Sequence, residues 1–240
     1  MKPHAENRTA SVWTEADAIF VVFITLLMMS GGILGNILGT LADTNQSLKL
    51  GFSNIISLCM PVAVALMFLF KKHIETGFTL RSLLGITSPL SEVAKGFVFG
   101  IFIAVSALPL TYLVGVMYTK YFTHTPEAQT IMLSIFNKST PLWISITASV
   151  IIVTIAPFAE EVMYRGILVS VLGHCHSKVF SVVSSALFFS LLHMHLPAAP
   201  TLFFVGVVFT VAHISSGSIL LVTAMHAAFN LFNLAISLLL

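Results

Sequence analysis

Residues 142–172, LWISITASVIIVTIAPFAEEVMYRGILVSVL, decide the fold, because this 31-residue stretch is apolar apart from one short charged interruption. A straight α-helix of this length would measure about 46 Å, longer than the ~30 Å hydrocarbon core of a bilayer. Pro157 lies inside the stretch, so we expect a kink or a break just before the two glutamates that follow it. If the stretch divides there, it contributes two membrane spans instead of one.

The charged interruption consists of Glu160, Glu161 and Arg165. Between residue 139 and the last residue, 240, the only other Asp, Glu, Lys or Arg is Lys178. A charge near the bilayer centre costs roughly 2.5–3.5 kcal/mol on insertion scales. Two acids and a base within six residues therefore predict a functional site. The alternative is a salt-bridged helix end at the membrane interface.

The composition indicates an integral membrane protein. The chain of 240 residues is 57% hydrophobic and only 8% charged, whereas soluble domains carry about 25% charged residues. We predict an all-α, polytopic transmembrane bundle of about seven spans, with eight as the alternative. The predicted spans are residues 18–41, 50–70, 93–118, 142–172, 178–196, 199–215 and 217–240.

The chain is expected to form a single membrane domain with three parts. Residues 1–17 are polar and acidic, unlike the start of a signal peptide, so the first span is expected to be retained. Residues 18–141 would supply the amino-terminal spans and a short helix over 125–138, and residues 142–240 a catalytic core. The short helix could lie in the membrane interface or simply connect two spans. The basic loop 71–95 is expected to face the cytoplasm together with the amino terminus.

Three smaller features complete the organisation. Gly31, Gly35 and Gly39 have the spacing that lets two helix backbones approach closely, either within the bundle or, less readily, in a homodimer. Cys59 and Cys175 form no disulfide framework and are expected to be reduced. The net charge of +2 comes without a basic patch, which argues against nucleic-acid binding. The oligomeric state is left open.

Polar residues recur at helical spacing in three of the predicted spans. Residues four apart share a helix face, so Glu161 and Arg165 can pair, while Glu160 is rotated by about 100° towards another neighbour. Phe189 shares a face with His193 in the fifth span. His226 shares a face with Asn230 in the last span, and Asn233 lies on roughly the same side. Together these groups predict one polar site within the bundle.

These residues form three motifs that resemble those of a known family. The motifs are EExxxR at Glu160–Arg165, FxxxH at Phe189–His193 and HxxxN at His226–Asn230. In this order they are similar to the CAAX protease and bacteriocin-processing (Abi) family of intramembrane glutamic endopeptidases, which includes type II CAAX prenyl endopeptidases. The resemblance covers about residues 142–240.

The resemblance implies a role for each motif residue. Glu160 would be the general base that activates water, and His193 would hold that water. His226 and Asn230 would form the oxyanion site, while Glu161, Arg165 and Phe189 would support the helices. No cofactor or metal is implied. The partners would be the bilayer and a peptide or membrane-protein substrate, in the plasma membrane of a prokaryote, with the site open to the cytoplasm and no prenylated substrate expected.

Three other interpretations remain open from the sequence. Glu160, His193 and His226 could instead be zinc ligands, although no HExxH spacing is present and Asn230 would then lack a role. The chain could be a non-catalytic scaffold or a bacteriocin-immunity protein of the same fold. It could also be a proton-coupled transporter, for which buried Glu and His relays are usual.

Overall fold

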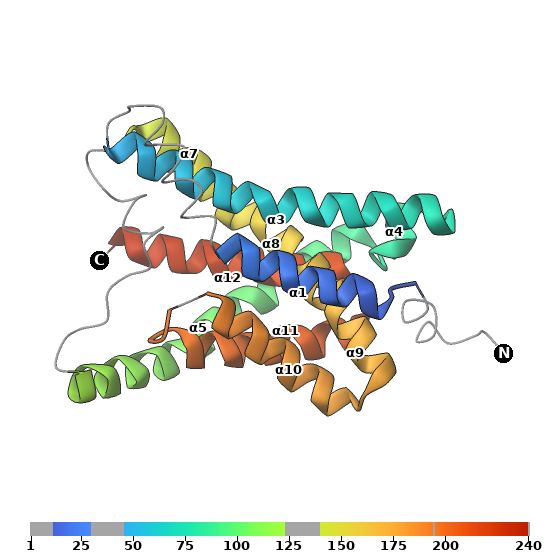
Figure 1. The fold of residues 1–240 in the computed structure, drawn as a ribbon. Helices are drawn as coiled ribbons and strands as arrows, with labels where there is room; N and C mark the ends of the chain where they lie inside the picture. Colours follow the sequence, from blue (N-terminus) through green and yellow to red (C-terminus); the bar gives the residue numbers. More distant parts are fainter. Residues whose placement is uncertain (1–11, 30–45, 123–139, 194, 240) are drawn as a thin grey trace.

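The fold is a bundle of helices, and the described residues contain no strand. The computed structural model describes residues 12–29, 46–122, 140–193 and 195–239 (Figure 1). One long helix, Leu142–Cys175, passes through the bundle. The helices around it are α1 (Glu15–Met29), α3 (Gln46–Thr76), α4 (Leu80–Leu83), α5 (Pro89–Phe122), α10 (Lys178–Leu192), α11 (Ala199–Ser216) and α12 (Ile219–Leu239).

The helices confirm the all-α membrane class, whereas the number of spans stays a prediction. Among the described residues, four helices are long and apolar enough to cross a bilayer, namely Pro89–Phe122, Leu142–Cys175, Ala199–Ser216 and Ile219–Leu239. Lys178–Leu192 is apolar but shorter. The predicted interfacial helix over 125–138 and the glycine face of the first span lie outside the described residues.

The Leu142–Cys175 helix does not divide, so of the two alternatives expected at Pro157, a kink or a break, the break is wrong. Its successive segments are α7 (Leu142–Val150), η2 (Ile151–Ile155), α8 (Ala156–Glu161), η3 (Val162–Val169) and α9 (Ser170–Cys175). Segments η2 and η3 are π-helical, which means that their turns are one residue wider than α-helical turns. A wider turn accommodates Pro157, whose ring would clash with the preceding α-helical turn.

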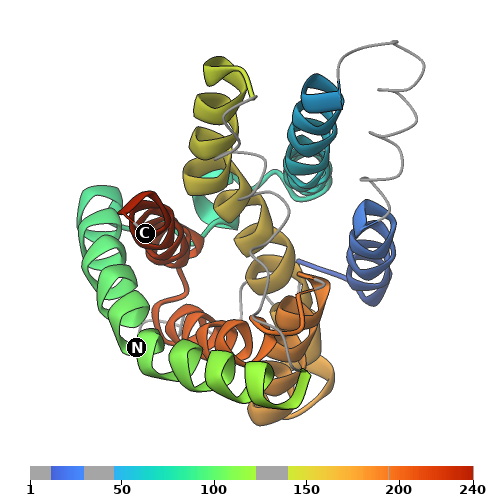
Figure 2. The same cartoon turned by 90° about the vertical axis from the view of Figure 1, so that its left-hand side faces the viewer.

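From Ala156 to Leu172 this central helix is enclosed by the rest of the bundle, whereas its first turns expose side chains such as Leu142 and Val150. It packs against α3 and α1 along one side and against α12, α10 and α11 along the other. Figure 2 shows the yellow-to-gold helix passing between these two groups. The segment that carries the glutamates is therefore removed from lipid, as a buried charge requires.

Helices α5 and α12 pack closely because α5 presents glycines to its neighbour. A Cβ atom added to Gly96 would collide with the Leu221 carbonyl oxygen, and one added to Gly100 would collide with the Met225 carbonyl oxygen. The four-residue spacing of these glycines is the small-residue pattern that permits close approach in membranes. The pattern is visible in the sequence of the third predicted span, but only the glycines of the first span were predicted to pack in this way.

An ion cluster around the buried Asp17 joins the polar start of α1 to the end of α3. Lys71 Nζ lies 3.0 Å from Asp17 Oδ1, and Lys72 Nζ lies 2.9 Å from Asp17 Oδ2. Burial raises the pKa of Asp17, but hydrogen bonds from Lys72, Thr14 and Lys71 outweigh it and hold that pKa well below the usual range. Because the folded-state pKa is lowered, this stabilisation is fully present at neutral pH and is lost progressively as the pH falls below the ordinary value of 3.8.

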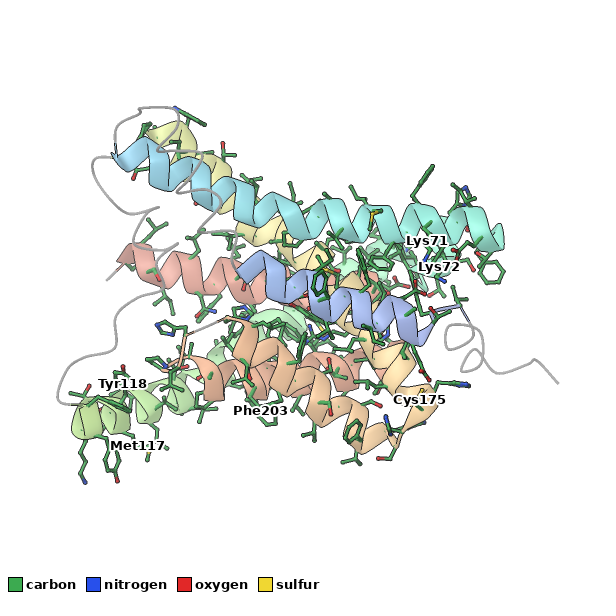
Figure 3. The ribbon with its side chains drawn as sticks, in the orientation of Figure 1. Lys71, Lys72, Met117, Tyr118, Cys175 and Phe203 are labelled. Atoms are coloured by element: carbon green, nitrogen blue, oxygen red, sulfur yellow. The ribbon has the colours of Figure 1, made fainter. Side chains whose placement is uncertain are left out.

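The two ends of the bundle are more polar than its middle. Lys71 and Lys72 lie at one end, and Met117 and Tyr118 lie at the other (Figure 3). Between these ends α5 exposes large apolar side chains such as Val98 and Phe102. Apolar exposure along the middle of a long helix, with charged residues such as Lys95 and Lys120 towards its two ends, is the pattern of a lipid-facing surface.

Candidate active site

Glu160 lies in a cavity between the central helix and its neighbours. The cavity has a volume of about 180 Å³ and is lined by Thr25, Pro61, Glu160, Met163, Tyr164, Leu192 and His193. This is room for several waters, at about 30 Å³ each. Glu160 Oε2 is buried without a hydrogen-bond partner among the described residues. The site thus contains a carboxylate oxygen that is free to bind water or substrate.

His193 faces the same cavity from the end of α10. Its Nδ1 atom lies 2.8 Å from the Phe189 carbonyl oxygen. Because a carbonyl only accepts, Nδ1 must carry a proton, which leaves Nε2 of the neutral ring as an acceptor. The Phe189 ring packs edge-on against the imidazole, with centroids 4.7 Å apart. The i, i+4 spacing predicted this contact, which fixes the orientation of the ring.

Glu161 turns away from the cavity into a buried polar cluster. Its Oε1 atom lies 2.9 Å from Arg165 Nη1 and 2.8 Å from His226 Nδ1. The side chains of Glu161 and Arg165 are both fully buried. The Arg165 guanidinium lies over the Phe189 ring, 4.7 Å from its centroid. The two adjacent glutamates therefore occupy different environments, as the rotation of about 100° between them predicts.

His226 is not among the residues that line the cavity. It is buried between two aromatic rings, with centroids 5.7 Å from Phe189 and 5.3 Å from Phe209. Its Nδ1 atom faces the Glu161 carboxylate, so this nitrogen donates and only Nε2 remains for another partner. The sequence motif predicts His226 as a site residue but does not predict Glu161 as its partner, because 65 residues separate the two.

Asn230 also has a partner of its own. Its Nδ2 atom donates to the Ile152 carbonyl oxygen at 3.0 Å, across to the π-helical segment η2. Asn233, one turn further along α12, donates instead to the Phe229 carbonyl of its own helix at 2.8 Å. The two asparagines therefore have different environments, although both lie on roughly the same side of α12.

Two of the helices that line the cavity, α1 and α3, were not expected from the sequence to contribute to it. Thr25 comes from α1 and Pro61 from α3, both within the amino-terminal spans. The Thr25 hydroxyl donates to the Val21 carbonyl oxygen at 2.6 Å, which satisfies it within its own helix. The sequence feature that could have indicated Thr25 as a site residue is its hydroxyl group within an apolar predicted span. No comparable signal marks Pro61.

Metal ligation requires at least three suitable side chains in one place. Within the part of the chain that the structure describes, no group of three His, Cys, Asp or Glu side chains is arranged to hold a metal ion. Glu160 and His193 share the cavity, but His226 is bound to Glu161. The three ligands of the zinc interpretation are therefore not gathered at one point.

Comparison with protein-family models gave a match in the carboxy-terminal part of the chain. Residues 141–232 match the family model described as Type II CAAX prenyl endopeptidase Rce1-like. The match contains all three motifs and confirms the resemblance that they indicated. No curated protein matches the chain, and no solved structure matches it.

Proposed function

We propose that this chain, in which residues 141–232 match a type II CAAX prenyl endopeptidase model, is an intramembrane endopeptidase that uses Glu160 to activate water. One observation carries the proposal. Glu160 and His193 come from different helices and line the same cavity, where Glu160 Oε2 has no partner among the described residues. A buried carboxylate beside an imidazole acceptor is suited to general-base chemistry.

The two acceptors can orient one water molecule. A water that donates one proton to Glu160 and the other to His193 Nε2 directs its lone pairs away from both groups, towards an entering peptide carbonyl. Glu160 then takes a proton from the water while the water oxygen bonds to the carbonyl carbon. As the C–N bond breaks, Glu160 returns the proton to the leaving amine. No covalent enzyme intermediate is needed.

We assign oxyanion stabilisation to His226 and Asn230, both on α12. Since Nδ1 of His226 donates to Glu161, the ring can offer a second N–H only as an imidazolium, which the Glu161 carboxylate stabilises. Glu161, Arg165 and His226 would then carry one net positive charge, which favours a developing oxyanion. Asn230 retains a second N–H beyond the one it gives to Ile152.

The substrate is proposed to be a peptide or a membrane protein cleaved within or beside the bilayer. Residues 142–240 would form the catalytic core, with α1 and α3 completing its cavity through Thr25 and Pro61. The basic loop between α3 and α5 supports a cytoplasmic orientation for that end of the bundle. A prokaryotic plasma membrane is the proposed location.

Cleavage in native membranes tests the proposed function. Membranes that contain the wild-type chain should generate new peptide amino termini that are absent with Glu160→Ala at equal expression. A quenched fluorescent peptide ending in a CAAX sequence, with and without a farnesyl group, should then show whether the isoprenoid lowers KM. Identical amino termini for wild type and Glu160→Ala would refute the proposal.

A chelator experiment separates the glutamate mechanism from the zinc one. We expect purified protein to hold less than stoichiometric zinc and to keep its activity during prolonged treatment with a membrane-permeant chelator. The reason is that Asn230 fits a metal-free site, since an amide is a good neutral donor but a poor zinc ligand. One zinc per chain, with chelator inhibition that added zinc reverses, would make Glu160, His193 and His226 ligands.

A further inference from the structure

Pro157 leaves one carbonyl of the central helix without its helical partner. In segment η2 the Ala156 N–H donates to the Ile151 carbonyl, five residues back. In that wider register the Ile152 carbonyl would accept from residue 157, but proline has no N–H. Its α-helical donor would be Ala156, which is already used. The Ile152 carbonyl is therefore orphaned by Pro157 within its own helix.

Asn230 supplies the missing donor from another helix. Its Nδ2 atom lies 3.0 Å from the Ile152 carbonyl oxygen, and Ile152 is buried. A buried carbonyl that is left unpaired is costly, and within a bilayer no bulk water is at hand to satisfy it. Helix α12 also packs against η2 and α8, so this hydrogen bond joins two surfaces already in contact.

We infer that Asn230 is a positioning residue, which caps the Ile152 carbonyl orphaned by Pro157 and thereby holds the widened turn that precedes the glutamate segment. Segment α8 starts directly after this turn and carries Glu160 as its fifth residue. If the turn changed its register by one residue, Glu160 would rotate by about 100° around the helix axis. The inference rests on the proposed function for its link to catalysis, but not for the cap itself.

The cap is distinct from the oxyanion role proposed above. Oxyanion stabilisation requires an amide N–H directed at the substrate, whereas the cap uses an N–H directed at the backbone of η2. The amide group has two N–H donors, so Asn230 can serve both purposes. Only the cap depends on Pro157, and this dependence makes the two roles separable by experiment.

A double-mutant cycle between residues 230 and 157 tests the inference. Asn230→Leu removes the donor at similar size and should lower Tm in detergent by about 5 °C, the expected effect of an unpaired buried carbonyl. In a Pro157→Ala background, the new alanine supplies a backbone N–H to the helix, so the same Asn230→Leu substitution should lower Tm by less than half as much. Pro157→Ser supplies the same N–H if Pro157→Ala accumulates poorly.

Kinetics at a temperature where every variant is folded complete the test. For the quenched CAAX peptide, Asn230→Leu should lower kcat by about 10³-fold or more with little change in KM, because it removes one oxyanion donor, worth about 10²–10³-fold, and also displaces the base. In the Pro157→Ala background this factor should shrink at least about tenfold. The matched control is Asn233→Leu, whose donor caps a carbonyl of its own helix and should leave kcat near wild type.

Each outcome supports or overturns the inference. Equal Tm losses in both backgrounds would show that Asn230 does not compensate for Pro157. A Tm loss that shrinks while the kcat factor stays the same would confirm the cap but overturn its link to catalysis, because the loss of turnover would then come from the oxyanion role. Since the thermal cycle needs no substrate, an inactive wild type would refute the proposed function while the cycle still decides whether the cap exists.

Discussion

Glu160→Gln is expected to abolish turnover while the protein still inserts and folds. A glutamine keeps the size of the side chain but cannot take a proton from water, and general-base catalysis typically contributes about 10²–10⁴-fold. Because Glu160 Oε2 has no protein partner among the described residues, the substitution breaks no ion pair. Tm in detergent should therefore stay within about 2 °C of wild type, a shift below roughly 1 kcal/mol.

The measurement is kcat on the quenched peptide together with Tm for the same preparation. Glu75→Gln is a suitable control, because Glu75 is a partly exposed carboxylate of α3 far along the chain from the motif residues. It should leave kcat unchanged. Activity of Glu160→Gln within about tenfold of wild type would exclude the glutamate as the base.

Glu161→Gln is expected to have the opposite profile, with a large loss of stability. Its carboxylate oxygen Oε1 is the partner of both Arg165 and His226. Neutralising it leaves the fully buried Arg165 without its counter-charge, a cost of about 3–5 kcal/mol for a buried pair. For a chain of this size that corresponds to a fall in Tm of about 10 °C or more.

Two comparisons make this prediction specific to the buried cluster. Glu161→Leu combined with Arg165→Met should recover much of the lost Tm, because it removes both charges and keeps apolar volume. The control Glu75→Gln breaks the pair with the half-exposed Lys71 and the pair with Lys72. Because Lys72 keeps Asp17 as a partner at 2.9 Å and Glu75 is itself partly exposed, this change should cost only about 1 kcal/mol. A Tm for Glu161→Gln within about 2 °C of wild type would mean that Arg165 finds other compensation.

The sequence predicted those parts of the site that depend on local helix geometry. The spacing of four residues pairs Glu161 with Arg165 and packs Phe189 against His193, because residues at i and i+4 share a face of any regular helix. The scarcity of charge over the last hundred residues likewise predicts long apolar helices in any arrangement. These properties are determined within one or two turns of chain.

At Pro157 the local sequence does not fully determine the conformation of the helix backbone. The sequence predicted a kink or a break in the helix before the glutamates, and the helix does depart from regular α-helical geometry there. The departure is a widened turn in a continuous helix, because a carbonyl left without a donor can be satisfied by another helix. Whether such a donor is available depends on what packs against the turn. The motif spacing does not contain this information.

By itself, then, the sequence determined that the chain is a helical membrane protein, which residues carry its unusual polarity, and which of them meet within one helix. Only the tertiary structure decided that His226 contacts Glu161, that Asn230 reaches Ile152, and that Thr25 and Pro61 close the cavity around Glu160. These contacts depend on how far each helix is rotated about its axis and shifted along it. Those two quantities are set by side-chain packing between distant segments, including the glycine face between α5 and α12, and periodicity along a single helix does not specify them.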